Sequence, residues 1–302
     1  MRQDINKGKK SNLIPRLLMI SSAGFWGASF IFTKGLFLTE EAITPVVIVT
    51  FRLLIASVFT IPTLMVWKRL QRLDLKDLPM FLVLAFFEPF IYSILETSGV
   101  SLVSSSLASI IIATIPLFTP FGIALVYKEK LPWVAIVGAV LSMMGIVVMM
   151  LGPDLSFEAN PRGVFYLAMC VVVAVCYTLV LVKVLDKYPP LTITAYQNLL
   201  SLLYFIPLVL IINRDVFPLL SYSWPMFGRL IFLGVFCSTV AYMGFNVGIK
   251  HLGATSASVY NNLIPVFTLV LAVLIGQESL SLMKVLGMAV VLVGLFLAQK
   301  RK

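Results

Sequence analysis

Runs of about twenty apolar residues, separated by short polar connections, recur along nearly the whole 302-residue chain. A helix of about this length is what crosses the ~30 Å hydrocarbon core of a bilayer. Only 12% of the residues are charged, about half the share found in soluble domains. The strands of a membrane β-barrel would be alternating segments of about ten residues, which these runs are not. We therefore predict an all-α membrane protein.

Ten runs can be delimited, and proline or a short polar link stands between most neighbours. The predicted helices cover residues 13–33, 44–66, 78–97, 102–126, 131–151, 162–185, 191–212, 226–249, 254–275 and 280–299. The longest polar link of the first half runs from Trp67 to Asp77, and the link from Gly152 to Pro161 separates the two halves. These links leave no room for a soluble domain.

Part of the first half returns 149 positions later in the second half, with no gap between Gly99 and Gly294. The second helices align with a shorter offset of 145, which places Gln197 opposite Arg52. Two copies of an odd number of helices insert in opposite orientations, and such inverted repeats are common in secondary transporters. Transport is therefore the leading hypothesis. The matching pairs are Gly99/Gly248, Ala108/Ala257, Ser109/Ser258, Ile115/Ile264, Pro116/Pro265, Phe118/Phe267, Thr119/Thr268, Glu129/Glu278, Gly138/Gly287 and Gly145/Gly294.

The net charge of +10 is spread over the connections and the chain ends and forms no single patch. If the N-terminus lies in the cytoplasm and there are ten crossings, 17 of the 23 Lys and Arg residues lie inside and five outside, with Arg52 inside a helix. The positive-inside rule then places both termini in the cytoplasm. The same distribution is a poor fit to a nucleic-acid partner, and we expect none.

Several short motifs occur in order and return in the second half. They are Trp26-Gly27, Phe51-Arg52-Leu53-Leu54, Ser104-Ser105-Ser106-Leu107-Ala108-Ser109 with Pro116 and Glu129, and Ala254-Thr255-Ser256-Ala257-Ser258 with Pro265 and Glu278. Through these motifs the chain resembles, over residues 13–299, the EamA-type transporters of the drug/metabolite transporter superfamily. It departs from their pattern at Gln277, which separates Gly276 from Glu278 where the family usually has Gly-Glu.

The resemblance implies a multi-pass protein of the bacterial cytoplasmic (inner) membrane that moves small solutes, commonly by export of amino acids or related metabolites. It further implies a cytoplasmic tail over residues 1–12, a first five-helix repeat over 13–152 and a second over 153–302. The first, third, fourth, sixth, eighth and ninth helices would line a central cavity. We predict a secondary active exporter that works by alternating access and functions as a monomer, and coupling to protons is our hypothesis for its energy source.

The third predicted helix carries Glu88, Tyr92 and Glu96, spaced by four. An ionisable residue in a membrane helix is costly and usually faces a cavity or a partner. We expect the glutamates to couple protons or to bind a substrate amine, although Glu96 could simply be solvated at the outer interface. Pro89 should open the helix there. The second half has Cys237 and Phe245 at the matching positions, so this chemistry would be asymmetric.

Arg52 is the one basic residue placed inside a predicted helix. Its guanidinium could pair with a glutamate or with a substrate carboxylate, and we favour a structural ion pair or gate. The remaining candidates are aromatic or amide groups that line the cavity or hydrogen-bond between helices. These are Trp26, Tyr177, Asn246, Asn261 and Asn262.

Other polar and small residues are given structural roles. Glu129 and Glu278 each precede a helix, whose N-terminal dipole a carboxylate complements. The glycines at 138, 145, 287 and 294 should let helices pack closely. The three cysteines, Cys170, Cys176 and Cys237, lie in apolar runs and should pack as small hydrophobes.

Other classes of function fit less well. An enzyme would need a nucleophile–base pair or metal ligands, and an ATP-driven pump would need a phosphate-binding Gly-rich loop; the sequence offers neither. We expect no enzyme activity, cofactor or metal. A channel would need a filter signature or a ring of charge. The alternative that stays open is a membrane receptor or scaffold with a carrier fold that no longer transports.

Overall fold

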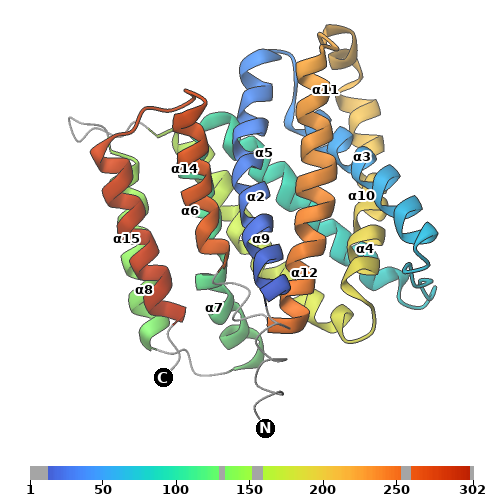
Figure 1. Ribbon diagram of the computed structural model, residues 1–302, viewed down its shortest axis with the longest axis horizontal. Helices are drawn as coiled ribbons and strands as arrows, with labels where there is room; N and C mark the ends of the chain where they lie inside the picture. Colours follow the sequence, from blue (N-terminus) through green and yellow to red (C-terminus); the bar gives the residue numbers. More distant parts are fainter. Residues whose placement is uncertain (1–12, 129–132, 152–158, 253–259, 300–302) are drawn as a thin grey trace.

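The computed structural model describes residues 13–128, 133–151, 159–252 and 260–299, and the regular structure of these ranges is helical. The helices pack side by side in one bundle (Figure 1). In chain order they are α2 (Leu13–Thr39), α3 (Pro45–Val66), α4 (Leu78–Ala85), η1 (Phe86–Ile91), α5 (Tyr92–Leu102), α6 (Ser105–Ala113), α7 (Ile115–Tyr127), α8 (Trp133–Met149), α9 (Pro161–Leu185), α10 (Pro190–Ile212), η2 (Arg214–Leu219), α11 (Trp224–Ile231), η3 (Phe232–Val240), α12 (Ala241–Leu252), η4 (Asn261–Leu263), α14 (Ile264–Leu274) and α15 (Leu282–Gln299).

Seven stretches of these helices are long and apolar enough to cross a membrane, and three more apolar helices are shorter. The all-α membrane class is thus confirmed for the described residues, whereas the number of ten crossings stays a prediction. The long stretches are Leu13–Thr39, Pro45–Val66, Leu78–Leu102, Ser105–Gly122, Pro161–Leu185, Pro190–Ile212 and Trp224–Gly248, and the shorter ones are Ile136–Met149, Asn261–Leu274 and Leu282–Leu297.

The predicted ends of the first and third helices and the predicted start of the fourth were wrong. The first helix continues to Thr39 and not to residue 33, because Lys34 does not end it: its Nζ donates to the carbonyl oxygens of Val100 (3.1 Å) and Ser101 (2.9 Å), so the cation is satisfied inside the bundle. The third helix extends to Leu102, and the fourth starts only at Ser105. Ser104 has extended backbone angles and accepts a hydrogen bond from Leu107 N, as an N-cap does.

The two halves interlock rather than lying apart. Helix α2 packs on α12 and α14 of the second half, and α9 packs on α5 and α7 of the first. Helix α3 likewise packs on α10 and η3, and α10 packs in turn on α4 and η1. Because the pattern is preserved when the halves are exchanged, each half completes the core of the other.

Helices α8 and α15 form a pair that stands at one edge of the bundle (Figure 1). A Cβ added to Gly145 would lie 2.7 Å from the carbonyl oxygen of Gly287, and one on Gly294 would lie 2.7 Å from that of Gly138. No real Cβ tolerates such a distance, so the four repeated glycines allow the backbones to touch. Their predicted close packing is confirmed.

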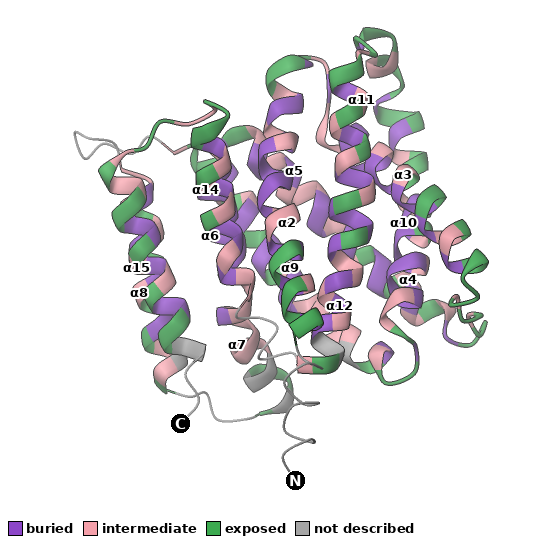
Figure 2. Ribbon diagram, viewed as in Figure 1, coloured by how far each residue is buried: buried purple, intermediate pink, exposed green. Residues whose placement is uncertain are grey.

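Large apolar side chains are exposed on this protein, and many polar ones are buried together with the apolar core. Figure 2 shows which parts of each helix are buried and which are exposed. Val58, Phe165, Leu210 and Phe296 are examples of exposed apolar residues. A helix surface of this kind is stable against lipid tails, because water is absent there.

Candidate functional site

The third and eighth helices are both irregular near their middle. Between α4 and α5, the segment η1 contains Glu88, whose backbone is extended (φ −136°, ψ 121°), and the Glu88–Pro89 peptide bond is cis. The predicted opening of this helix at Pro89 is therefore confirmed. Between α11 and α12, the nine residues of η3 form a π-helix. Such wide turns free backbone groups and are frequent at functional sites.

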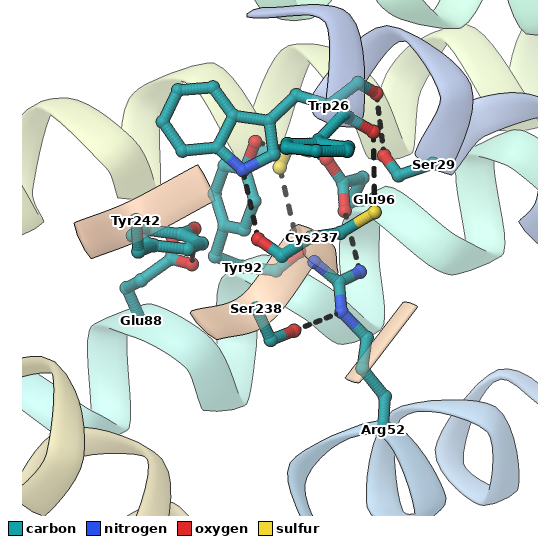
Figure 3. Close-up of polar contacts among 11 residues, drawn as sticks. Trp26, Ser29, Arg52, Glu88, Tyr92, Glu96, Cys237, Ser238 and Tyr242 are labelled. Carbon is teal, nitrogen blue, oxygen red and sulfur yellow. Dashed lines mark hydrogen bonds and ion pairs between the residues drawn. The ribbon is translucent and has the colours of Figure 1, made fainter. Parts of the chain in front are cut away.

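Glu88 is buried, with 6% of its surface exposed. The hydroxyl of Tyr242, from α12 of the second half, donates a hydrogen bond of 2.7 Å to its Oε1 (Figure 3). The extended backbone of η1 thus directs a carboxylate of the first half toward a phenol of the second half.

Arg52, on α3, connects the two irregular helices (Figure 3). Its Nε donates to Ser238 Oγ of η3 at 2.5 Å, and its Nη1 lies 3.9 Å from Glu96 Oε2 of α5. Tyr92 donates from its hydroxyl to the other oxygen of Glu96 at 3.1 Å. The expected ion pair with a glutamate is present, but the guanidinium fork is divided between two partners instead of being bidentate to one carboxylate.

A small cavity lies between these groups and has a volume of about 10 Å³, room for about one water molecule. Of the predicted site residues, Arg52 and Glu88 line it. Sequence reasoning missed three other polar residues that line it: Thr194, Asn198 and Ser238. Gln197 alone was signalled, as the repeat mate of Arg52. The full lining is Val49, Arg52, Leu53, Glu88, Pro89, Ser93, Thr194, Gln197, Asn198, Ser238 and Tyr242.

Trp26 and Tyr177 lie beside the cavity lining and not in it. The indole Nε1 of Trp26 donates to the carbonyl oxygen of Cys237 at 3.2 Å, and its ring is 5.1 Å from that of Tyr242 and 5.0 Å from that of Phe245. Tyr177 donates from its hydroxyl to Gln197 Oε1 at 3.2 Å. Both residues therefore hold lining residues in position.

The predicted asparagines do not line the cavity. Asn246 donates from Nδ2 to Thr194 Oγ1 at 2.9 Å and joins α12 to α10, which is the helix–helix role considered above. Asn261 and Asn262 start the short 3₁₀ turn η4 before Pro265, with Asn262 buried.

Glu278 stabilises a helix start, but of a different helix from the one predicted. Its Oε1 accepts from the backbone N of Ser106 at 2.9 Å, so it caps α6 of the other half, and its Oε2 is 2.9 Å from Lys284 Nζ. Proximity in sequence favoured α15, yet the inverted repeat brings the start of α6 closer. Glu129 lies outside the described residues.

A second cavity, of about 380 Å³, lies near Glu278 and is also lined by Lys34, Ser105 and Lys284. Its cations are already bound to Glu278 or to the carbonyl oxygens of α5. The central cavity, where opposite charges of two helices meet, is the stronger candidate site.

Each end of the bundle has contacts that join the halves. We name the end with the α3–α4 link the Asp77 end: there Lys187 Nζ lies 2.6 and 2.7 Å from the two Asp77 oxygens, and Tyr188 donates to Oδ2 at 2.5 Å. These hydrogen bonds lower the pKa of Asp77, and Asp77 raises the pKa of Lys187. At the opposite end, the Glu40 end, Glu40 accepts from the backbone N of Ser221 at 3.1 Å and from its hydroxyl.

The free cysteines sit inside the bundle, as expected of small packing residues. Cys170 and Cys237 are buried, and their thiols donate to the carbonyl oxygens of Tyr92 and Phe25, at 3.5 and 3.2 Å. Cys176 is partly buried.

The family model described as the EamA-like transporter family matches the chain twice, over residues 13–151 and 161–299. A relative from Archaeoglobus fulgidus, named an uncharacterized transporter, is 26% identical over 95% of this chain and 99% of its own length. The uncharacterized transporter YdfC of Bacillus subtilis is 26% identical over 93% of this chain and 88% of its own.

A solved crystal structure superposes with a TM-score of 0.67 at 17% identity, covering 94% of this chain and 95% of that one. At this identity the likeness shows the fold alone. The sequence relatives and the family model agree on transport rather than on any enzyme activity. The chain therefore belongs to the EamA-like transporter family and is a multi-pass membrane transporter.

Proposed function

We propose that the protein is a secondary active transporter that exports a small metabolite, such as an amino acid, by alternating access in exchange for protons. The observation that carries the proposal is the central cavity, where the ionisable side chains of Arg52 and Glu88 meet inside a membrane protein. Buried ionisable groups in membrane helices are costly and usually mark a substrate or ion pathway.

The size of the cavity supports alternating access. About 10 Å³ cannot hold a metabolite, so the halves have to separate for one to enter. Contacts between the halves hold the Asp77 end, through Lys187, and the Glu40 end, through Ser221. Release of one set at a time would open the cavity to one side of the membrane and then to the other.

We infer the topology from the distribution of Lys and Arg, and the direction of transport from the resemblance to exporters. With ten crossings and both termini in the cytoplasm of a bacterium, the Asp77 end faces the cytoplasm and the Glu40 end faces outward. The resemblance to exporters then favours loading from the Asp77 end. Proton entry from outside would supply the energy, with Glu88 and Glu96 as the carboxylates in the path.

The experiment starts with substrate identification. Expression in a sensitive host, grown on a panel of toxic metabolites, shows which one the protein removes. The purified protein is then reconstituted in liposomes, and flux of that solute is measured under an imposed pH gradient.

We expect flux that follows the gradient, and we expect Glu88→Gln and Glu96→Gln to reduce its pH dependence. If both variants keep the wild-type pH dependence, proton coupling through these residues is wrong. If no solute moves in response to any gradient, the receptor or scaffold alternative is correct.

A further inference from the structure

Glu88 differs from the other buried and partly buried carboxylates of the described ranges in what balances its charge. Asp77, Glu96 and Glu278 each have a Lys or Arg nitrogen within 4 Å, and Glu40 accepts from a backbone N–H. In the described part of the chain, the hydrogen-bond partner of Glu88 is the neutral hydroxyl of Tyr242. A buried carboxylate in this situation needs a proton or a cation.

Arg52 does not meet this need, because its charge is already balanced by Glu96. Figure 3 shows its guanidinium directed toward Glu96 and Ser238, while Glu88 lies beside Tyr242. Besides Glu96, the other titratable groups around Glu88 are tyrosine hydroxyls and a thiol, and none of these can carry a positive charge that would balance Glu88. The full set is Arg52, Tyr92, Glu96, Cys170, Tyr177 and Tyr242.

The surroundings of Glu88 favour a cation over an anion. The ring of Tyr242 contacts that of Trp26, which in turn contacts Phe245. Aromatic faces attract ammonium groups, most strongly where water is excluded. Of these rings, that of Tyr242 lines the cavity together with Glu88, so an ammonium group there would meet both a carboxylate and an aromatic ring.

We propose that the substrate carries a protonated amine and that this ammonium takes the place of the proton on Glu88, one for one. The ammonium N–H donates to the carboxylate, and the displaced proton passes to water on the side to which the cavity is open. No covalent bond forms or breaks besides the O–H bond of the carboxyl. This inference rests on the proposed exchange mechanism. It adds the substrate class, and it names Glu88 as the residue that selects an ammonium group over a neutral one.

Binding can be measured without transport, through the fluorescence of Trp26. The chain has four tryptophans, and Trp67, Trp133 and Trp224 are exposed. The full-length variant Trp67→Phe/Trp133→Phe/Trp224→Phe in detergent leaves Trp26, whose ring is in contact with Tyr242, as the reporter. It is titrated with primary amines from ethylamine to 2-phenylethylamine, and with the alcohol of the same carbon skeleton for each.

We expect amines, but not their alcohols, to change the Trp26 emission, with weaker binding at lower pH because protons compete for Glu88. Glu88→Gln should weaken amine binding by at least about tenfold, since a charge-assisted hydrogen bond is lost. Glu88→Asp should bind more tightly than Glu88→Gln, and Glu41→Gln, an exposed glutamate, should bind like the parent. Thermal unfolding verifies that each variant is folded.

Three results would overturn the proposal: equal binding of amines and alcohols, unchanged amine binding in a folded Glu88→Gln variant, or no response to any amine of the panel. None of them depends on flux. If the protein transports some other solute in exchange for protons, the exchange mechanism stands and the amine proposal fails. If amines bind but no solute is transported, the amine proposal stands and the transport function fails.

Discussion

The third and eighth helices are repeat mates, and the comparison between them separates fold from chemistry. Both are interrupted near the middle, by η1 and by η3. In the third helix the backbone leaves helical angles at Glu88, whereas the eighth has no proline in η3 and only widens its turns. An interruption near the middle of this helix is therefore a property of both repeats. In the third helix, next to Pro89, the backbone departs further from helical geometry than in the eighth.

The side chains differ much more than the backbones. The position of Glu88 corresponds to Cys237, whose carbonyl oxygen accepts from Trp26, and the position of Glu96 corresponds to Phe245, which packs on that ring. The third helix supplies the carboxylates, and the eighth supplies Ser238 and Tyr242 to bind Arg52 and Glu88. The two repeats thus share an interrupted helix, but the interruption in the third helix carries the carboxylate of Glu88, whereas the eighth helix supplies the side chains that surround it.

The largest effect is expected from removing the residue that joins the two helices. Arg52→Ala leaves Glu96, whose side chain is only 14% exposed, without a cation, which costs about 3–5 kcal/mol of unfolding free energy. The measurement is chemical or thermal unfolding in detergent. Arg52→Ala/Glu96→Gln should regain most of the loss, because no unpaired charge remains. Equal stability of Arg52→Ala and wild type would show that the pair is unimportant.

Arg52→Lys tests the geometry of the same link. A lysine keeps the charge but cannot reach Ser238 and Glu96 together, so it should transport several-fold more slowly than wild type. Wild-type transport by this variant would mean that the divided guanidinium contact does not matter.

The next effect compares matching positions of the two helices directly. Glu88→Gln should lower flux driven by a pH gradient by about 100-fold, roughly 3 kcal/mol, because the exchangeable charge is lost. Cys237→Ser, at the corresponding position, keeps a donor for the Phe25 carbonyl oxygen and should change flux less than about twofold. Similar losses for both variants would contradict the asymmetry.

A smaller difference is expected between the repeat-mate glycines. A Cβ on Gly99 would lie 2.5 Å from Cγ of the buried Leu167 and 3.2 Å from the Gly163 carbonyl oxygen. One on Gly248 would lie 2.0 Å from Sδ and 2.5 Å from Cγ of Met19, which is buried but unbranched. Gly99→Ala should therefore cost about 1–3 kcal/mol of unfolding free energy, and Gly248→Ala less, because Met19 can change rotamer. The reverse order of the two Tm values would show that the fit at Met19 is the tighter one.

The smallest effect concerns how the two helices begin. Asp77 precedes the third helix and binds Lys187, whereas Ser223 caps the eighth by accepting from Met226 N at 3.3 Å. The lowered pKa of Asp77 means that its stabilising effect is complete above the unfolded value near 4 and is lost as pH falls through the folded value. Asp77→Asn should lower Tm at neutral pH by about 1–2 °C.

The pH series supplies the control for that variant. The Tm difference between wild type and Asp77→Asn should shrink below about pH 4, since both then lack the charge. The loss in Ser223→Ala should not depend on pH, because a serine hydroxyl does not titrate. An Asp77→Asn difference that stays constant in acid would contradict the ion-pair origin.

Much of the architecture could be predicted from the sequence, because it follows from local and repeated patterns. Apolar runs define helices, and glycines at matching places in α8 and α15 predict close contact whatever surrounds them. The carboxylates of the third helix also stood out, since charge is rare in such segments. The polar lining contributed by Thr194, Asn198 and Ser238 did not stand out. Small polar residues are common on many helix faces, and their orientation depends on neighbouring helices.

The sequence by itself determined that this protein is a helical membrane protein with a duplicated half, and that its unusual charges are Arg52, Glu88 and Glu96. Tertiary structure alone decided the partners: Arg52 between Glu96 and Ser238, Glu88 with Tyr242, and Glu278 at the start of α6. The physical reason is one of range. Partition into a membrane depends on each segment's own composition, whereas the balance of a buried charge depends on atoms that the interlocked halves bring from more than a hundred residues away.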